Sequence, residues 1–311
     1  MPNDLTPQGE SGWVQVRDHD GTGLPFSKGL MATSILATGL TTDRAYAIAA
    51  DIQRQLHERQ LSEIDADALA QMTTALIDQH VGPEHAQRYL AWRGVKRSGR
   101  PVVIAFGGAP GVGKSTLATR LAVRLGITRV VTTDTIREVL RTVIPPAVLP
   151  ELHLSTFESP KGMSERAQLG SFERQAHAVG AATAAVAARL MTEKRSAIVE
   201  GVHMLPGQIT DALNGHAVRP IVVEMLLTLG DEGLHHAHLS HRLNGEPARG
   251  GKRHLENLSR IRAIQADLIE MAQRQDVSIY DIANPNRLTQ RIVDEVIAQV
   301  SDQPEAVRAH A

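Results

Sequence analysis

A glycine-rich segment between an apolar run and a helical pattern carries the clearest chemistry in this chain. Gly108 to Ser115 reads G-x-x-x-x-G-K-[ST], after the β-branched run 102–106 and before a helical pattern that starts at Lys114. Glycines let successive backbone N–H groups point at one anion, and a helix N-terminus adds its positive end. Lys114 supplies a charge for outer phosphates, and the Ser115 hydroxyl can ligate Mg²⁺. The segment predicts a site for ATP and magnesium. Its predicted nucleotide-binding residues are Gly108, Ala109, Pro110, Gly111, Val112, Gly113, Lys114, Ser115 and Thr116.

Two acidic residues follow other apolar runs. Asp134 comes after the run 129–132, and Glu200 ends the run 197–200. The carboxyl ends of parallel strands meet at one edge of a sheet, so both carboxylates are expected beside the glycine-rich segment. Asp134 could accept a proton from an attacking hydroxyl or hold magnesium through water, and the alternative is a helix N-cap. Glu200 is predicted to position magnesium together with Ser115.

Basic residues near these carboxylates could bind an acceptor. Arg137 lies three residues after Asp134, and Arg141 lies four residues after Arg137, so all three can share one face of a short helix. Guanidinium groups there would bind a second phosphate or a carboxylate, and the alternative is a helical ion pair at the surface. His203, close after Glu200, is either a substrate contact or a loop histidine bonded to backbone.

The segment 235–262 is rich in histidine and arginine and has glycines in its middle. It has three interpretations: a histidine metal site, a solvated basic face, or a lid over two anionic substrates. We favour the lid, because phosphoryl transfer needs positive charge at the transferred group; its candidate catalytic residues are Arg242, Arg249 and Arg253. Asn284 follows the final predicted strand and either contacts the adenine ring or forms a turn.

The composition limits the partners. A net charge of −1 and 3% aromatic residues argue against nucleic acid, which needs basic surface and stacking side chains. The absence of cysteine excludes disulfides and thiolate metal sites. The chain shows no leader pattern and no apolar stretch of membrane-spanning length, so we expect a cytoplasmic protein without a membrane partner. A homo-oligomer is compatible with the sequence.

The chain divides into two predicted domains, 1–95 and 96–311. The first shows a hairpin pattern and four helical patterns, and the basic segment 93–100 is predicted to be an aperiodic linker. In the second, strands alternate with helices, which predicts an α/β fold with a mostly parallel sheet flanked by helices.

Taken together, the motifs resemble 2-phosphoglycerate kinases. Five segments agree in the same order: 107–116, 132–141, 149–158, 198–207 and 260–265. The resemblance spans about residues 100–300. It implies a P-loop kinase that uses ATP and Mg²⁺ to phosphorylate the hydroxyl of 2-phosphoglycerate, a small phosphorylated acceptor, to 2,3-bisphosphoglycerate. It also implies that 149–158 binds the acceptor, with His153, Ser155 and Thr156 as candidates.

Residues 13–92 resemble an ATP-cone, a small mainly helical domain. The matching pieces are Val16-Arg17-Asp18 and Leu24-Pro25-Phe26-Ser27-Lys28. This domain either binds a regulatory nucleotide or only packs against the kinase domain or a second subunit. For the whole chain, the alternatives are a kinase for another phosphorylated hydroxy-acid, such as a phosphomevalonate-like compound, and a non-catalytic nucleotide sensor. A polynucleotide 5′-kinase is disfavoured by charge and by the scarcity of aromatic residues.

Overall fold

The computed structural model describes residues 13–18, 21–158, 165–245 and 250–301. The chain divides into two compact units, Met1–Gly94 and Val95–Ala311. No helix in the described part of the chain is both long and apolar enough to cross a bilayer.

The first unit combines a small sheet with four helices. Strands β1 (Gln15–Arg17) and β2 (Gly23–Pro25) form the expected hairpin, and β3 (Glu63–Asp65), which the sequence pattern did not reveal, pairs in parallel with β1. The helices are α1 (Lys28–Leu36), α2 (Thr42–Glu58), α3 (Ala66–Val81) and α4 (Pro83–Arg97). Apolar residues at helical spacing on α2 form much of the core: Ala45, Ile48, Ala49, Ile52 and Leu56.

Helix ends in this unit follow local side-chain chemistry. The Ser27 hydroxyl accepts from the Leu30 N–H at the start of α1, and the Asp65 carboxylate accepts from two N–H groups of α3. α4 continues through Arg97, so the prediction of an aperiodic linker over 93–100 is wrong for residues 93–97. Lys96 and Arg97 lie in the final turn, where positive charge stabilises the carboxyl end of a helix.

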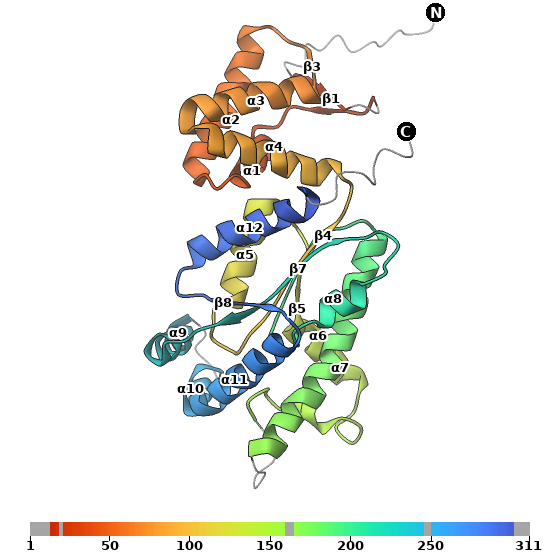
Figure 1. Cartoon of the computed structure of the whole chain (residues 1–311), viewed down its shortest axis with the longest axis vertical. Helices are drawn as coiled ribbons and strands as arrows, with labels where there is room; N and C mark the ends of the chain where they lie inside the picture. Colours follow the sequence, from red (N-terminus) through yellow and green to blue (C-terminus); the bar gives the residue numbers. More distant parts are fainter. Residues whose placement is uncertain (1–12, 19–20, 159–164, 246–249, 302–311) are drawn as a thin grey trace, which may run out of the picture. The chain divides into compact units, whose positions relative to one another are not determined.

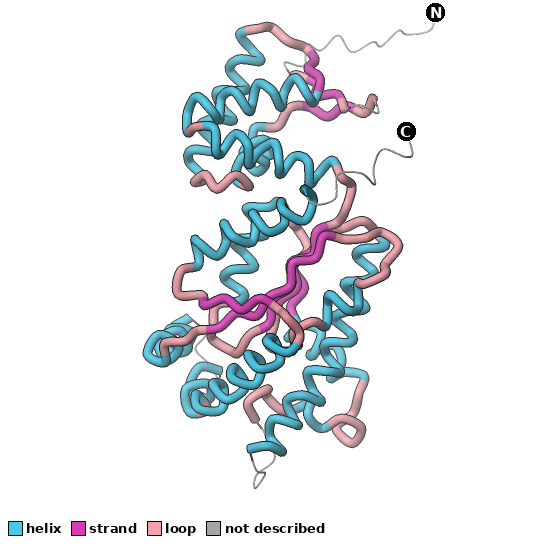
Figure 2. Tube along the Cα trace, in the orientation of Figure 1, coloured by secondary structure: helices cyan, strands magenta, loops and turns pink. Residues whose placement is uncertain are grey.

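The second unit is a five-stranded parallel sheet in the order β5-β6-β4-β7-β8 (Figures 1 and 2). The strands are β4 (Val102–Gly107), β5 (Val130–Thr132), β6 (Ala197–Glu200), β7 (Ile221–Thr228) and β8 (Ser278–Asp281). All six residues of the middle strand β4 are buried, as expected for a strand covered on both faces. The predicted α/β fold with a parallel sheet is confirmed.

Helices cover both faces of this sheet. They are α5 (Lys114–Leu125), α6 (Thr133–Val143), the 3₁₀ turn η1 (Pro150–His153), α7 (Glu165–Thr192), α8 (Gln208–Leu213), α9 (Glu232–Gly245), α10 (Gly250–Glu256), α11 (Leu258–Arg274) and α12 (Pro285–Ser301). Figure 1 shows α5 and α12 on one face and α7 and α8 on the other. Val103 and Ala105 of β4 pack in one core cluster with Met191 of α7 and Ile209 of α8.

The carboxyl end of β4 lies where open parallel sheets bind their ligands. From β4 the chain crosses toward β5 at one edge, and β7 and β8 lie on the other side of β4. The carboxyl end of β4 is therefore the point where the strand order changes direction, and loops diverge there to leave a crevice. The glycine-rich segment begins at this point.

Candidate active site

The glycine-rich segment forms a loop between β4 and α5. Gly108, Gly111 and Gly113 have φ angles of +146°, +86° and +97°, a region that L side chains rarely adopt. A Cβ atom on Gly108 would lie 2.4 Å from the carbonyl oxygen of Leu227, so a side chain there would displace backbone. α5 begins at Lys114, and its N-terminal N–H groups add to the loop. The loop has the shape of an anion-binding site, which we call the phosphate loop.

The two predicted magnesium ligands meet although they are far apart in the sequence. Ser115 Oγ donates a hydrogen bond to Glu200 Oε1 at 2.9 Å. The parallel register of β6 with β4 sets Glu200 opposite Phe106, which brings this carboxylate beside the loop. A hydroxyl and a carboxylate oxygen are the kind of protein ligands that Mg²⁺ takes, one or two at a time. The pair therefore fits a magnesium ion bound to nucleotide phosphates.

Lys114 lies close to Ser115 and Glu200, and all three side chains border one cavity. Its side chain is largely buried, and its Nζ donates to the carbonyl oxygen of Ala109 at 3.0 Å. The ammonium group is thus held over the loop that would cradle the phosphates, where a point charge can contact their outer oxygens.

Two cavities share the phosphate loop as a wall. The larger has a volume of about 400 Å³, which suits the base and sugar of a nucleotide. It is lined by the loop, α5, α9 and the segment after β8, including Arg120, Leu229, His238, His241, Ile282 and Pro285. The smaller has a volume of about 80 Å³. It is lined by Pro110, Lys114, Ser115, Thr132, Asp134, Thr156, Glu200, Gly201, Val202 and His254.

Asp134 lies in the first turn of α6, with its side chain 79% exposed, and it lines the smaller cavity beside Lys114. The alternative prediction, that Asp134 caps the helix, is wrong. Thr132 is the N-cap of α6, and its hydroxyl accepts from the Thr135 N–H at 3.2 Å. The carboxylate is thus available to a ligand in the cavity.

The two arginines of α6 do not line this cavity. Arg141 Nη1 donates to both carboxylate oxygens of Glu138, at 2.9 and 3.0 Å, and Arg137 also contacts this residue. Arg137 Nη2 donates to the carbonyl oxygen of Leu154. Burial, followed by the charge of Arg141, lowers the pKa of Arg137. The ion pair offered as the alternative is therefore present, and Arg137 also holds the segment 149–158.

His203 is not the backbone-bonded loop histidine that was one alternative. Its side chain is fully buried, and both ring nitrogens pair with side chains. A contact with substrate stays a prediction. Nδ1 lies 2.9 Å from Thr133 Oγ1, and Nε2 lies 3.0 Å from Gln175 Oε1. Burial, followed by the charges of Arg137 and Lys114, lowers the pKa of His203 to about 3, so the imidazole is neutral.

The segment 149–158 brings one of its three candidates into the smaller cavity. Thr156 lines the cavity. His153 Nε2 instead donates to the carbonyl oxygen of Ile144 at 2.9 Å, and the Ser155 N–H donates to Glu158 Oε2 at 3.1 Å. His153 and Ser155 therefore have contacts that shape the segment.

Of the three arginines predicted for the lid, Arg253 is the one whose side chain is described, and the lid stays a prediction. Arg253 on α10 forms an ion pair with Glu158. Arg249 lies outside the described residues, as does the side chain of Arg242 on α9. His254 lines the smaller cavity, and its ring lies 4.7 Å from that of Phe157. Within the described residues no group of three or more histidine, aspartate or glutamate side chains could hold a metal ion.

Sequence reasoning missed a contact between α9 and the phosphate loop. His235 Nε2 lies 2.8 Å from the carbonyl oxygen of Pro110, and His238 Nδ1 lies 3.2 Å from that of Gly111. Each imidazole donates, because a carbonyl oxygen can only accept. The spacing of three residues, which puts both rings on one helix face, was the available signal.

Asn284 precedes α12, and its Oδ1 accepts from the Arg287 N–H at 3.2 Å. The turn-forming alternative therefore describes its contact. Its neighbours Ala283 and Pro285 line the larger cavity.

A parallel sheet whose central strand runs into a phosphate loop, beside a hydroxyl–carboxylate pair, defines a P-loop kinase, an ATP-dependent phosphotransferase. No protein-family model matches the chain. It is 32% identical over 283 residues to the 2-phosphoglycerate kinase of Pyrococcus horikoshii, covering 89% of this chain and 91% of the relative. It is 36% identical over 266 residues to that of Methanocaldococcus jannaschii, covering 83% of each. The chain belongs to the 2-phosphoglycerate kinase family.

Two further similarities each cover about two thirds of this chain. The 2-phosphoglycerate kinase of Pyrococcus furiosus is 40% identical over 201 residues, 63% of this chain and 67% of the relative. Among solved structures, a gluconokinase from Sinorhizobium meliloti 1021 matches with a TM-score of 0.36 and 17% identity, over 65% of this chain and 93% of that one.

Proposed function

We propose that this enzyme transfers the γ-phosphoryl group of ATP to the free hydroxyl of 2-phosphoglycerate and so forms 2,3-bisphosphoglycerate. The family supports the acceptor, since the relatives are named for it. One observation carries the proposal for the reaction. The smaller cavity is lined by Lys114, Ser115 and Glu200, assigned to the nucleotide and magnesium, and also by Asp134 and Thr156, assigned to the acceptor. Nucleotide-binding and acceptor-binding groups thus face the same small space.

The step follows from this arrangement. The acceptor's hydroxyl oxygen forms a bond to the γ-phosphorus as the bond between that phosphorus and the bridging oxygen breaks, and ADP leaves. Asp134 accepts the hydroxyl proton, for which an exposed carboxylate at the cavity wall is suited. Magnesium held by Ser115 and Glu200 would neutralise negative charge on the phosphate oxygens.

Lys114 adds its positive charge to that of magnesium. From its place over the loop it would contact the outer phosphates. His254 lines the smaller cavity, as Thr156 does, and Arg253 pairs with Glu158 at the end of the segment that carries Thr156. The site must therefore hold two anions, ATP and the phosphorylated acceptor, with the hydroxyl aligned to the γ-phosphorus. Catalysis of this type depends on positioning and electrostatics.

The test is an acceptor panel with product identification. ADP release is measured by a coupled assay with 2-phosphoglycerate, 3-phosphoglycerate and mevalonate phosphate, and the product is identified by ³¹P NMR. We expect transfer to 2-phosphoglycerate, and loss of about 10²-fold or more in kcat for Lys114→Met and Asp134→Asn. Lys194→Met, at an exposed lysine, is the control.

Other outcomes select the alternatives. Preference for mevalonate phosphate supports a kinase for another phosphorylated hydroxy-acid. ATP binding without acceptor-dependent ADP release supports a nucleotide sensor. Near-normal transfer by Lys114→Met contradicts the assigned role of the phosphate loop.

The first unit enters the proposal through its resemblance to ATP-cone domains. Its hairpin carries Arg17, which pairs with Glu63 of β3 at 2.6 Å, and Lys28 opens α1. Titration of the full chain with a non-hydrolysable ATP analogue distinguishes the two alternatives. Two bound nucleotides per chain support a regulatory site, and one supports a packing module.

A further inference from the structure

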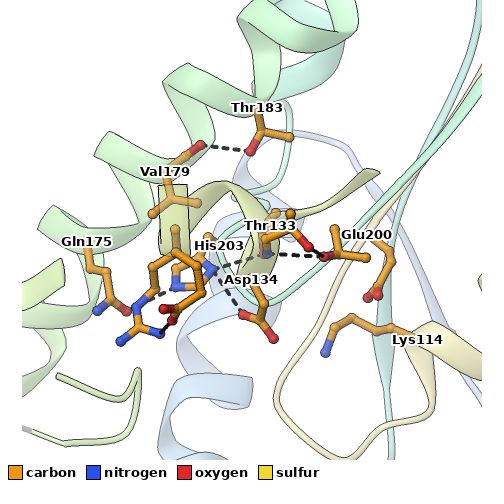
Figure 3. Close-up of polar contacts among 12 residues, drawn as sticks. Lys114, Thr133, Asp134, Gln175, Val179, Thr183, Glu200 and His203 are labelled. Carbon is orange, nitrogen blue, oxygen red and sulfur yellow. Dashed lines mark hydrogen bonds and ion pairs between the residues drawn. The ribbon is translucent and has the colours of Figure 1, made fainter. Parts of the chain in front are cut away.

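Three buried polar side chains form a continuous link between α7 and α6 (Figure 3). Gln175 bonds to His203, and His203 bonds to Thr133. Thr133 and His203 are fully buried, and Gln175 is 2% exposed. Buried polar groups destabilise a fold unless they are paired, so three of them in a row require an explanation.

The direction of each hydrogen bond in this link is fixed. Gln175 Nε2 donates to the carbonyl oxygens of Glu151 and Leu154, which can only accept. Its Oε1 must therefore face His203 and accept from Nε2–H. Because the imidazole is neutral, its Nδ1 has no proton and accepts from the hydroxyl of Thr133. One tautomer satisfies every group, so the link is rigid.

Each end of the link lies at a segment assigned to the acceptor. At one end, the carbonyl oxygen of Leu154, within 149–158, accepts from Gln175 and from Arg137. At the other end, Thr133 immediately precedes Asp134 in α6. His203 Nδ1 lies 3.8 Å from Asp134 Oδ1 and has no proton to donate, so its effect on that carboxylate passes through Thr133.

Backbone fixes Thr133 from the opposite side. Gly201 follows Glu200, and a Cβ atom on Gly201 would lie 1.8 Å from Thr133 Oγ1. Gly201 also has a φ of +155°. Thr133 is therefore confined between the backbone beside the magnesium-ligand carboxylate and the imidazole of His203.

We propose that Gln175, His203 and Thr133 are positioning residues that align Asp134 with the acceptor held by 149–158. The inference rests on the proposed function, because the role of Asp134 belongs to it. Because the hydrogen bonds of this link have one direction each, the position of the segment 149–158 and the position of Asp134 depend on each other. Loss of the link leaves nucleotide binding intact and misaligns proton removal, which lowers kcat.

The experiment compares Thr133→Val, which keeps the shape and removes the hydroxyl, with Thr133→Ser, which keeps the donor. We expect kcat with 2-phosphoglycerate to fall about tenfold or more for Thr133→Val, with KM for ATP within about twofold of wild type. Thr133→Ser should restore most of kcat. Thr183→Val is the matched control, since within the described residues the hydroxyl of this buried threonine donates to the Val179 carbonyl oxygen of its own helix (Figure 3).

A second substitution, at the other end of the link, controls for the possibility that variants at position 133 misfold. Gln175→Met breaks the link at its other end and should lower kcat similarly, and the double variant should lose little more than the worse single variant. Unchanged kcat in both single variants overturns the positioning role while the proposed function stands. An equal loss in Thr183→Val, or independent multiplicative losses in the double variant, also overturns it. A wild-type enzyme that transfers nothing to 2-phosphoglycerate refutes the proposed function, and this inference with it.

Discussion

Acidification should destabilise this enzyme through His203, and the structure sets the size of the effect. The pKa of this imidazole falls from an ordinary 6.5 to about 3 in the folded state. The unfolded chain therefore binds a proton at this residue that the folded chain rejects. Stability from the neutral side chain is fully present above the unfolded pKa, and it is lost as the pH falls below 6.5 toward 3.

The magnitude follows from the difference in proton binding. One pKa unit corresponds to about 1.4 kcal/mol, so a decrease from about pH 7.5 to about pH 5 should lower the free energy of unfolding by about 2 kcal/mol through this residue alone. His203→Gln removes the titrating group. The variant should be less stable at neutral pH, yet it should lose about 2 kcal/mol less than wild type on acidification.

Urea unfolding at the two pH values measures this difference. Both tryptophans, Trp13 and Trp92, lie in the first unit, so far-UV circular dichroism is the better signal for the unit that holds His203. His177→Gln is the control, since His177 is exposed on α7 and should leave the pH dependence unchanged. Equal losses in wild type and His203→Gln would show that the imidazole is not buried in its neutral form.

Three further substitutions test the site. Glu200→Gln should raise the Mg²⁺ concentration for half-maximal activity about tenfold, because an amide replaces a charged ligand; an unchanged magnesium titration contradicts its role. His235→Leu should raise KM for ATP several-fold by removing a donor to the phosphate loop, worth about 1 kcal/mol, whereas exposed His236→Leu should not; steady-state kinetics compare them. Gly201→Ala should cost about 3 kcal/mol of stability, since its methyl group would overlap Thr133, and unfolding within about 0.5 kcal/mol of wild type would refute this.

Local signals made the phosphate loop and its helix predictable from sequence. Gly113 before α5 and Gly126 after it both adopt left-handed backbone, and the helix begins at Lys114 as predicted. The pairing of Ser115 with Glu200 was also predictable, although 85 residues separate them, because parallel strands bring their carboxyl ends to one edge.

Contacts that depend on tertiary packing were not predictable. Gln175 lies on the buried stripe of α7 with Phe172, Ala176 and Val179, and a polar residue on an apolar stripe was the only local indication of a partner. Which partner it finds depends on how α7 lies against the loop after β6, and sequence spacing does not encode that. The contact of His203 with side chains was missed for the same reason.

Among the residues that the structure describes, Ser115 is the one that lines both cavities. Under the proposed function, sequence changes around Thr156 or His254 would alter which alcohol is accepted, while the residues around the nucleoside stay the same. Such a layout lets acceptor preference diverge among related enzymes while the phosphate donor stays the same.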